Sequence, residues 1–509
     1  MTHYTSELRL ILGSQITQEE HSETIIEPTE RMDWMRKMRD FIHGVEVYGR
    51  TLELSKDLIN ADQFESLVIL PPAVRVRGRE GKEVVVPGPR RADDESLTRR
   101  SRSRMEHIRK NGFLIRRSIN PVIAWPAHLG QSRGERLKKD LESIWAEHGI
   151  EAAFQPVPFN SVEELGVAVE AGGYDSVLAI LPEGSNAPRS ANDTHEQIKR
   201  RLDVPSQCVH HDHTLPARWL KVSWDELRAL QGPDGRRARR IHQTYEICLG
   251  NLLVKHHCFP FAPSDPFHYN VHVGLDVGGV HNTNAVACLG YGFRRPAKTL
   301  FFLLDEIAIE VQKKEPIPTD SLFRGLLGLF ERVHSELRSL GIKADFESVL
   351  FHRDGALLGA GDLWNEEDAL FKVYAELNGR GWVADDARWT VAEILKSAEN
   401  WRLLRSVNGL VRNPLVGYVA FPYEDQNVAL IATTGAPYLT QGTAHPLLVR
   451  ISDIAGQARR EHVVQDVIWQ ADLCFTKPDM GMWLPWVLHV ADSGALQLSK
   501  SYRISGITA

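Results

Sequence analysis

The chain has 509 residues, of which 43% are apolar and 25% charged, and this is ordinary for a soluble globular protein of two or three domains. It contains no run of 18 apolar residues and no signal-peptide layout, so we expect a cytoplasmic protein without membrane contact. The net charge of −6 argues against nucleic-acid binding through bulk basic charge, and the five cysteines, an odd number without CxxC spacing, indicate reduced thiols.

Residues 1–117 form an N-terminal or linker region with only fragments of predicted structure. Helical spacing covers 30–47, and a short strand at 66–70 ends at two prolines. The segment 75–104 is rich in glycine, proline and arginine, and we expect it to lie mostly on the surface.

Basic residues gather in islands in the first half of the chain, among them Arg99–Arg104 and Arg236–Arg240. We hypothesise that the islands line one groove that follows a phosphate backbone. For any single island, a solvated surface is the simpler interpretation.

Residues 118–265 alternate between apolar strands and amphipathic helices, as a parallel sheet with helical crossovers does. The strands and helices are predicted at residues 120–125, 134–148, 153–158, 161–171 and 176–181. The pattern predicts a Rossmann-like α/β domain. Ligands in such folds bind outside the carboxyl ends of the strands, and a helix carrying His195 starts just beyond one of them.

Four polar residues around this helix predict a phosphate pocket. His195 and Lys199 are four residues apart and share one helix face. A Val-Pro-Ser-Gln turn then brings the amide of Gln207 back near the end of the helix, and Lys255 arrives on a later helix. Converging lysines and an amide suit a phosphate better than a metal. The alternative, without a binding site, is an ordinary basic amphipathic helix, in which His and Lys four residues apart are common.

This motif resembles the MID domain of Argonaute proteins, which holds the 5′-phosphate and first base of a guide strand. The resemblance implies that His195 stacks on the first base and that Lys199, Gln207 and Lys255 bind the phosphate. A polar insertion at 231–240 separates Gln207 from Lys255 by more than in shorter family members. The nearby run His210–His213 has metal-binding residue types, but neighbours on a strand alternate faces and cannot all reach one ion.

Residues 266–509 predict a second domain with acids at strand ends. Three strands, a long helix and a fourth strand are predicted at residues 269–277, 285–290, 300–304, 320–340 and 347–355. The first and fourth strands carry Asp276 and Asp354, and a final helix from residue 485 carries Asp492. We also expect a helix at 391–407 and a strand at 427–433. Three antiparallel strands, a helix and a strand ending in an acid are the layout of a ribonuclease H-like domain.

The local sequences around these acids resemble the PIWI domain of Argonautes. They are Gly274-Leu-Asp276-Val, His352-Arg-Asp354-Gly, and Asp492 after Pro485. The resemblance implies that Asp276, Asp354 and Asp492 are catalytic ligands of Mg²⁺ or Mn²⁺. Hard divalent ions prefer carboxylate oxygen, and two of them about 3.5–4 Å apart can clamp an in-line displacement at phosphorus. For each acid alone, a turn former at a strand end is the alternative.

Two further ligands are expected from the family. Glu315 is the candidate for its mobile catalytic glutamate, with Asp320 as second choice. The C-terminal carboxylate of Ala509 is a candidate metal ligand at the guide 5′-phosphate, and a frayed tail is the alternative.

Taken together, residues 120–509 resemble a short prokaryotic Argonaute with MID and PIWI domains and without PAZ. The resemblance implies a complex with an APAZ-containing effector (sirtuin-like, TIR-like or a nuclease) in defence against invading plasmids and phages. We expect an RNA guide and a DNA target, although no residue distinguishes the two. Our first hypothesis is a non-cleaving guide-binding subunit. The second is a guide-directed endonuclease, and the third is an unguided ribonuclease H-like nucleic-acid binder.

Overall fold

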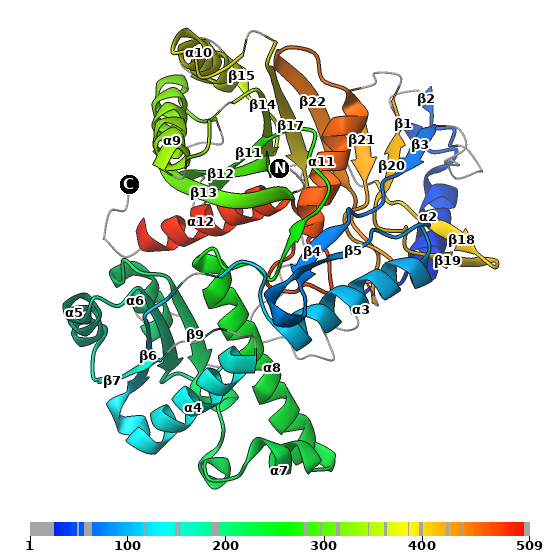
Figure 1. The fold of residues 1–509 in the computed structure, drawn as a ribbon. Coiled ribbons are helices and arrows are strands. Elements are labelled where there is room, and N and C mark those ends of the chain that lie inside the picture. The colour runs from blue at the N-terminus through cyan, green and yellow to red at the C-terminus, as the bar shows by residue number, and fades with distance from the viewer. Residues whose placement is uncertain are drawn as a thin grey trace.

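The computed structural model shows two lobes with the helix α12 (Trp486–Tyr502) between them (Figure 1). The structure describes residues 25–47, 50–54, 64–116, 118–147, 150, 153–185, 193–278, 284–295, 298–311, 316–339, 341–344, 346–360, 364–384, 386–396, 401–423, 427–439 and 441–502. Glu315 and Ala509 therefore lie outside the described residues.

The lower lobe contains a four-stranded parallel sheet, as the alternation of strands and helices predicted. Its order is β7 (Gln155–Phe159), β6 (Pro121–Pro126), β8 (Ser176–Leu181) and β9 (Ser206–His210). The central strands β6 and β8 are buried along their whole length, which is why both are continuous apolar runs. The helices of this lobe are α4 (Gln131–Glu147), α5 (Val162–Gly172), α6 (Thr194–Arg201), α7 (Trp224–Ala229) and α8 (Gly232–Lys255).

Residues 231–240 were expected to be a polar insertion. All of them except Gln231 lie in the first half of helix α8. A proline in the first turn starts the helix, and small or apolar residues at helical spacing form a buried stripe. That stripe includes Gly235, Ala238, Ile241 and Tyr245. The sequence did not indicate this helix, because four arginines on its exposed face give the segment a polar composition. As a result, Lys255 is the last residue of one long helix that begins beside these arginines.

The upper lobe is organised around a large mixed sheet, whose described part has nine strands. In sheet order these are β13 (Lys298–Glu310), β12 (Asn284–Arg295), β11 (Val271–Gly278), β14 (Ser348–Asp354), β17 (Arg388–Leu395), β22 (Leu447–Ala455), β21 (Val428–Ile431), β20 (Tyr418–Phe421) and β3 (Glu65–Val68). Strand β14 is parallel to β11 and β17, and the other pairs are antiparallel. The remaining helices here are α9 (Thr319–Ser339), α10 (Glu366–Gly379) and α11 (Arg460–Asp472).

The described parts of the range 391–407, residues 391–396 and 401–407, do not form the expected helix. The first part of this range is the central strand β17, and its last residues form the short strand β18 (Arg405–Val407), which pairs with β19 (Leu410–Arg412). Residues 389–394 are all buried, because β17 lies between two other strands in the sheet. A strand buried on both faces is a continuous apolar run, and such a run cannot be distinguished from a buried helix by its periodicity.

The N-terminal region folds onto the upper lobe instead of forming a surface segment. Strand β3 pairs with β20 at the edge of the large sheet. Residues 75–104, expected at the surface, contribute to β4 (Val74–Arg77), β5 (Glu83–Val86) and α3 (Asp94–Asn111). Strand β4 also pairs with β10 (Phe261–Pro263), so the end of the region 118–265 joins a sheet with the N-terminal region.

The basic island on α3 is partly buried, which contradicts a single phosphate-binding groove for all its members. The side chains of Arg100 and Arg104 are 1% and 0% exposed and bond to the Asp472 carboxylate at 2.7 and 3.1 Å. A buried guanidinium needs a partner of opposite charge, so these two arginines attach α3 to the end of α11. They are not available to a nucleic acid.

Outlying elements complete the described chain: α2 (Pro28–Ile42), β1 (Glu46–Val47), β2 (Arg50–Thr51), β15 (Gly359–Ala360) and β16 (Trp364–Asn365). One apolar core includes residues from the N-terminal region, the lower lobe and α12, among them Val76, Trp145 and Val487. None of the described helices is long and apolar enough to cross a membrane.

Candidate functional sites: a lysine pair and a carboxylate cluster

In the lower lobe, two lysines from different helices converge on one backbone oxygen. Lys255, at the end of α8, donates to the carbonyl oxygen of Ser206 at 2.6 Å. Lys199, on α6, donates to the same oxygen and also to the Ser206 hydroxyl at 3.0 Å. The structure therefore brings together the two cations that the sequence singled out; we call them the lysine pair.

The lysine pair holds two like charges close together; residue Lys199 is half-buried, whereas residue Lys255 as a whole is exposed. Desolvation of its ammonium lowers the pKa of Lys255 to about 7, and the charge of Lys199 lowers it further. Among the described residues, no carboxylate forms an ion pair with Lys255. An anion placed between the two ammonium groups would relieve their repulsion, because opposite charge favours the protonated form of both.

The lysine pair lies at the amino end of the parallel sheet. Ser206 is the first residue of β9 and pairs in register with Val177, near the start of β8. The expectation that the site opens at the carboxyl ends of the strands is therefore wrong for these lysines. Only the start of α6, which follows the carboxyl end of β8, fits that rule.

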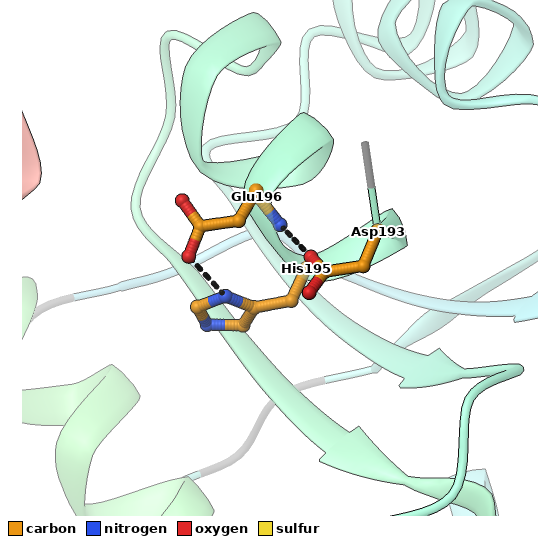
Figure 2. Close-up of side chains that lie close together, drawn as sticks. All are labelled: Asp193, His195 and Glu196. Atoms are coloured by element: carbon orange, nitrogen blue, oxygen red, sulfur yellow. Dashed lines mark hydrogen bonds and ion pairs between the residues drawn. The ribbon is translucent and has the colours of Figure 1, made fainter. Parts of the chain in front are cut away.

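His195 lies at the start of α6 and is half-buried (Figure 2). Its Nδ1 is 3.4 Å from Glu196 Oε1, and the N–H of Glu196 donates to Asp193 at 2.8 Å as a helix cap. Burial, followed by the charge of Lys199, lowers the pKa of His195, so the ring is neutral near pH 7. A neutral and partly exposed ring can stack on a base. Asp193, His195 and Glu196 have ligand atoms within 4.8 Å of one another, but helix capping already explains the place of Asp193.

Gln207 follows Ser206 in β9, and its side chain interacts with the thiol of Cys248 on α8. Its amide is thus adjacent to the lysine pair in the chain, but it faces Cys248 on α8, seven residues before Lys255. Sequence reasoning missed Ser206 itself, which supplies the oxygen on which both lysines meet. Ser206 lies inside the Pro-Ser-Gln turn, and this pattern indicates only a turn-forming role for it.

The run His210–His213 does not form a metal cluster within the described part of the chain. Residues 211–213 make a 3-10 turn, η5, and Asp212 accepts hydrogen bonds from Ser185. These contacts give the run a structural role.

In the upper lobe, the three predicted acids meet. Asp276 on β11, Asp354 at the end of β14 and Asp492 on α12 have carboxylate oxygens within 4.8 Å of one another. We call these three residues the carboxylate cluster. Asp320 is exposed in the first turn of α9 and is not part of it.

A glycine determines how closely α12 approaches the sheet. A Cβ at Gly274 would lie 2.2 Å from the carbonyl oxygen of Val487, so only glycine lets α12 cross β11 in direct backbone contact. This crossing places Asp492, five residues after Val487, beside Asp276, two residues after Gly274.

A lysine that sequence reasoning missed neutralises part of the cluster. The ammonium of Lys396, one residue beyond β17, is 2.6 Å from Asp354 Oδ2 and 2.8 Å from Asp492 Oδ1. Burial raises the pKa of Asp276 to about 8, and so do its hydrogen bond with Asp354 and the charge of that neighbour. A side chain just beyond the end of a strand that pairs with β14 can reach the cluster. Because residues 391–407 were expected to form a helix, Lys396 was not recognised as such a side chain.

The donor set of the cluster suits Mg²⁺ or Mn²⁺, since all three ligands are carboxylates and hard ions prefer oxygen. Asp276, Asp354 and Asp492 would hold such an ion. However, two of these three carboxylates are already bonded to Lys396.

Comparisons with known proteins bear on the fold. The sequence matched no family model and no curated protein. By structure, it is similar to Clostridium butyricum Argonaute bound to a guide DNA (5′ deoxycytidine) and a 19-mer target DNA, with a TM-score of 0.62 and 14% identity over 95% of this chain and 59% of that chain. It is likewise similar to Drosophila Piwi, with a TM-score of 0.64 and 14% identity over 95% of this chain and 61% of that one.

The molecule is thus a mixed α/β protein with a ribonuclease H-like sheet. More specifically, it has the Argonaute–Piwi fold, with a MID-like parallel sheet and a PIWI-like mixed sheet, as the sequence resemblance implied. The chain spans about 60% of the length of the two proteins that it matches.

Proposed function

We propose that this protein binds the 5′-phosphorylated end of a guide strand at the lysine pair and presents the strand to a complementary target. The observation that carries the proposal is the convergence of Lys199 and Lys255 on one carbonyl oxygen. The Argonaute–Piwi fold supports it, and the matched Clostridium butyricum Argonaute was solved with guide and target DNA. Base pairing would supply the sequence specificity, while the protein holds the backbone and the strand end.

The roles within the pocket follow from the residue chemistry. Lys199 and Lys255 would make charge-assisted hydrogen bonds to the phosphate, displacing the Ser206 carbonyl oxygen. His195 would stack on the first base, and Gln207 would turn from Cys248 to donate its amide to the phosphate. Ala509, beyond the described residues, remains a candidate for completing the pocket through its carboxylate.

The biological setting that we propose is prokaryotic defence. The protein would carry an RNA guide against invading plasmid or phage DNA and activate an APAZ-containing effector subunit. Support comes from the sequence resemblance to short prokaryotic Argonautes and from the Argonaute–Piwi fold. Sequencing the short nucleic acids that copurify, together with mass spectrometry of the copurifying proteins, tests the guide type and the partner.

The central test compares guides with a 5′-phosphate and guides with a 5′-hydroxyl. The double variant Lys199→Ala/Gln207→Ala is expected to lose at least about 100-fold in affinity for the phosphorylated guide, because hydrogen bonds to a charged group contribute about 1.5–3 kcal/mol each. Fluorescence anisotropy measures the affinities. Lys221→Ala, an exposed lysine of the same lobe, is the matched control and should change little. Undiminished affinity in the double variant, or no preference for the phosphate in the wild type, would reject the pocket and favour an unguided binder.

Guide-directed endonuclease activity is the second candidate, favoured by the meeting of Asp276, Asp354 and Asp492. Divalent ions held there would supply charge stabilisation for the attacking and leaving oxygens at phosphorus. The chain itself provides the carboxylates, and Gly274 positions the third one by letting α12 approach. Incubation of the guide-loaded protein with complementary target and Mn²⁺ is the test, and a target that stays intact removes this candidate.

A further inference from the structure

Lys396 occupies the place in the carboxylate cluster where a cation would lie. Its ammonium bridges Asp354 and Asp492 at 2.6 and 2.8 Å, although the two acids come from a strand and a helix far apart in the chain. The side chain is 30% exposed, so its charge is only partly screened by water. One monovalent cation thus already compensates two of the three acids.

The backbone keeps this ammonium close to the acids. Strand β17 pairs in parallel with β14, and Ile394 is the partner of Asp354 in that register. Lys396 is only two residues further along, so it cannot leave the cluster unless its side chain swings out toward solvent. A divalent ion would have to break both ion pairs or share the acids with a cation a few ångströms away.

We propose that Lys396 is a built-in counter-ion that excludes divalent metal from the carboxylate cluster. The cluster then joins β14, β17 and α12 as a structural ion-pair network, and it stays metal-free at millimolar Mg²⁺. This inference goes beyond guide binding and does not depend on it, because it concerns metal affinity in the absence of nucleic acid. It also predicts that the wild-type protein does not cut targets.

The test measures Mn²⁺ binding to the full chain without nucleic acid. Electron paramagnetic resonance of free Mn²⁺ and calorimetry give the affinities. Lys396→Met is expected to bind Mn²⁺ at least tenfold more tightly than the wild type, and Mn²⁺ should raise its melting temperature but not that of the wild type. The double variant Lys396→Met/Asp354→Asn should lose this gain in Mn²⁺ affinity. Lys372→Met removes an ordinary exposed ion pair with Asp368 and should leave Mn²⁺ affinity unchanged.

Two results would overturn the proposal: saturable wild-type Mn²⁺ binding as tight as that of Lys396→Met, or a gain that persists when Asp354 is replaced. If Lys396→Met does not fold, Lys396→Gln, which keeps a polar partner for both acids but removes the charge, takes its place in each comparison. This variant should then bind Mn²⁺ at least tenfold more tightly than the wild type, and equal affinities would contradict the proposal.

Discussion

The lysine pair of the lower lobe and the carboxylate cluster of the upper lobe arrange their charges in opposite ways. In the lysine pair, two ammonium groups share one neutral carbonyl oxygen. In the carboxylate cluster, three acids have an ammonium among them. The first arrangement would be stabilised by an added anion, whereas the second already contains its own counter-ion. The comparison therefore predicts different ligand preferences for the two lobes, an anion at the lysine pair and no added cation at the carboxylate cluster.

The largest expected effect is on stability, and it comes from removing one lysine from the lysine pair or the one lysine bonded to the carboxylate cluster. At pH 6, Lys255→Met should raise the free energy of unfolding, because it removes an ammonium whose pKa is lowered to about 7 and which lies beside the charge of Lys199. Lys396→Met should lower the free energy of unfolding, since it leaves the acids without their cation. Urea unfolding measures both.

The pH dependence of the Lys255→Met effect has a defined sign. Between pH 7 and 10.5 the unfolded chain holds the Lys255 proton and the folded chain does not, so wild-type stability rises with pH in this window. The gain from Lys255→Met should therefore shrink at pH 9. If both variants destabilised the protein equally at pH 6, the contrast between the two centres would be lost.

The second prediction separates the two centres structurally. Gly274→Ala should destabilise the protein by about 1–3 kcal/mol, because its Cβ would collide with the Val487 carbonyl and push α12 away from β11. The lysine pair should keep its preference for a 5′-phosphate, since neither lysine lies on β11 or α12. Thermal unfolding and guide-binding anisotropy on the same preparation check this. As a control, Gly250→Ala adds a Cβ in open space on α8 and should cost little.

The smallest expected effect is a pH dependence of guide binding. Above about pH 7, affinity for a 5′-phosphorylated guide should fall by at most tenfold per pH unit, because Lys255 must regain a proton to bind the phosphate. Below about pH 6 the phosphate itself loses charge, so affinity should be greatest between these values. Lys255→Arg stays charged and should give a flatter profile above pH 7. A wild-type profile that is flat from pH 7 to 9 would show that Lys255 is charged throughout.

The sequence predicted much of this architecture because short local patterns determine it. The apolar runs of β6 and β8, and the helices between them, are read directly from alternation and length. Asp276 and Asp354 were found because an acid at the end of an apolar strand is conspicuous, and Lys199 because of its helical spacing from His195.

What the sequence did not predict depends on contacts between distant segments. Burial on both faces made β17 resemble a helix, and this concealed Lys396. Arg100 and Arg104 looked like surface charges, because their partner Asp472 is 372 and 368 residues away in the chain, respectively. Ser206 became important only when α6 and α8 were placed around β9, since its contribution is a backbone oxygen that any residue carries.

The pairing of β3 with β20 has a practical consequence for dividing the molecule. A fragment starting at residue 266 would lack this outermost strand, leaving the backbone amides and carbonyls of β20 without partners. It would also lose the two arginines that neutralise Asp472. Unpaired edges invite association with other chains, so such a truncated version should precipitate or form oligomers. Residues 64–111 are better regarded as an integral part of the upper lobe than as a leader to it.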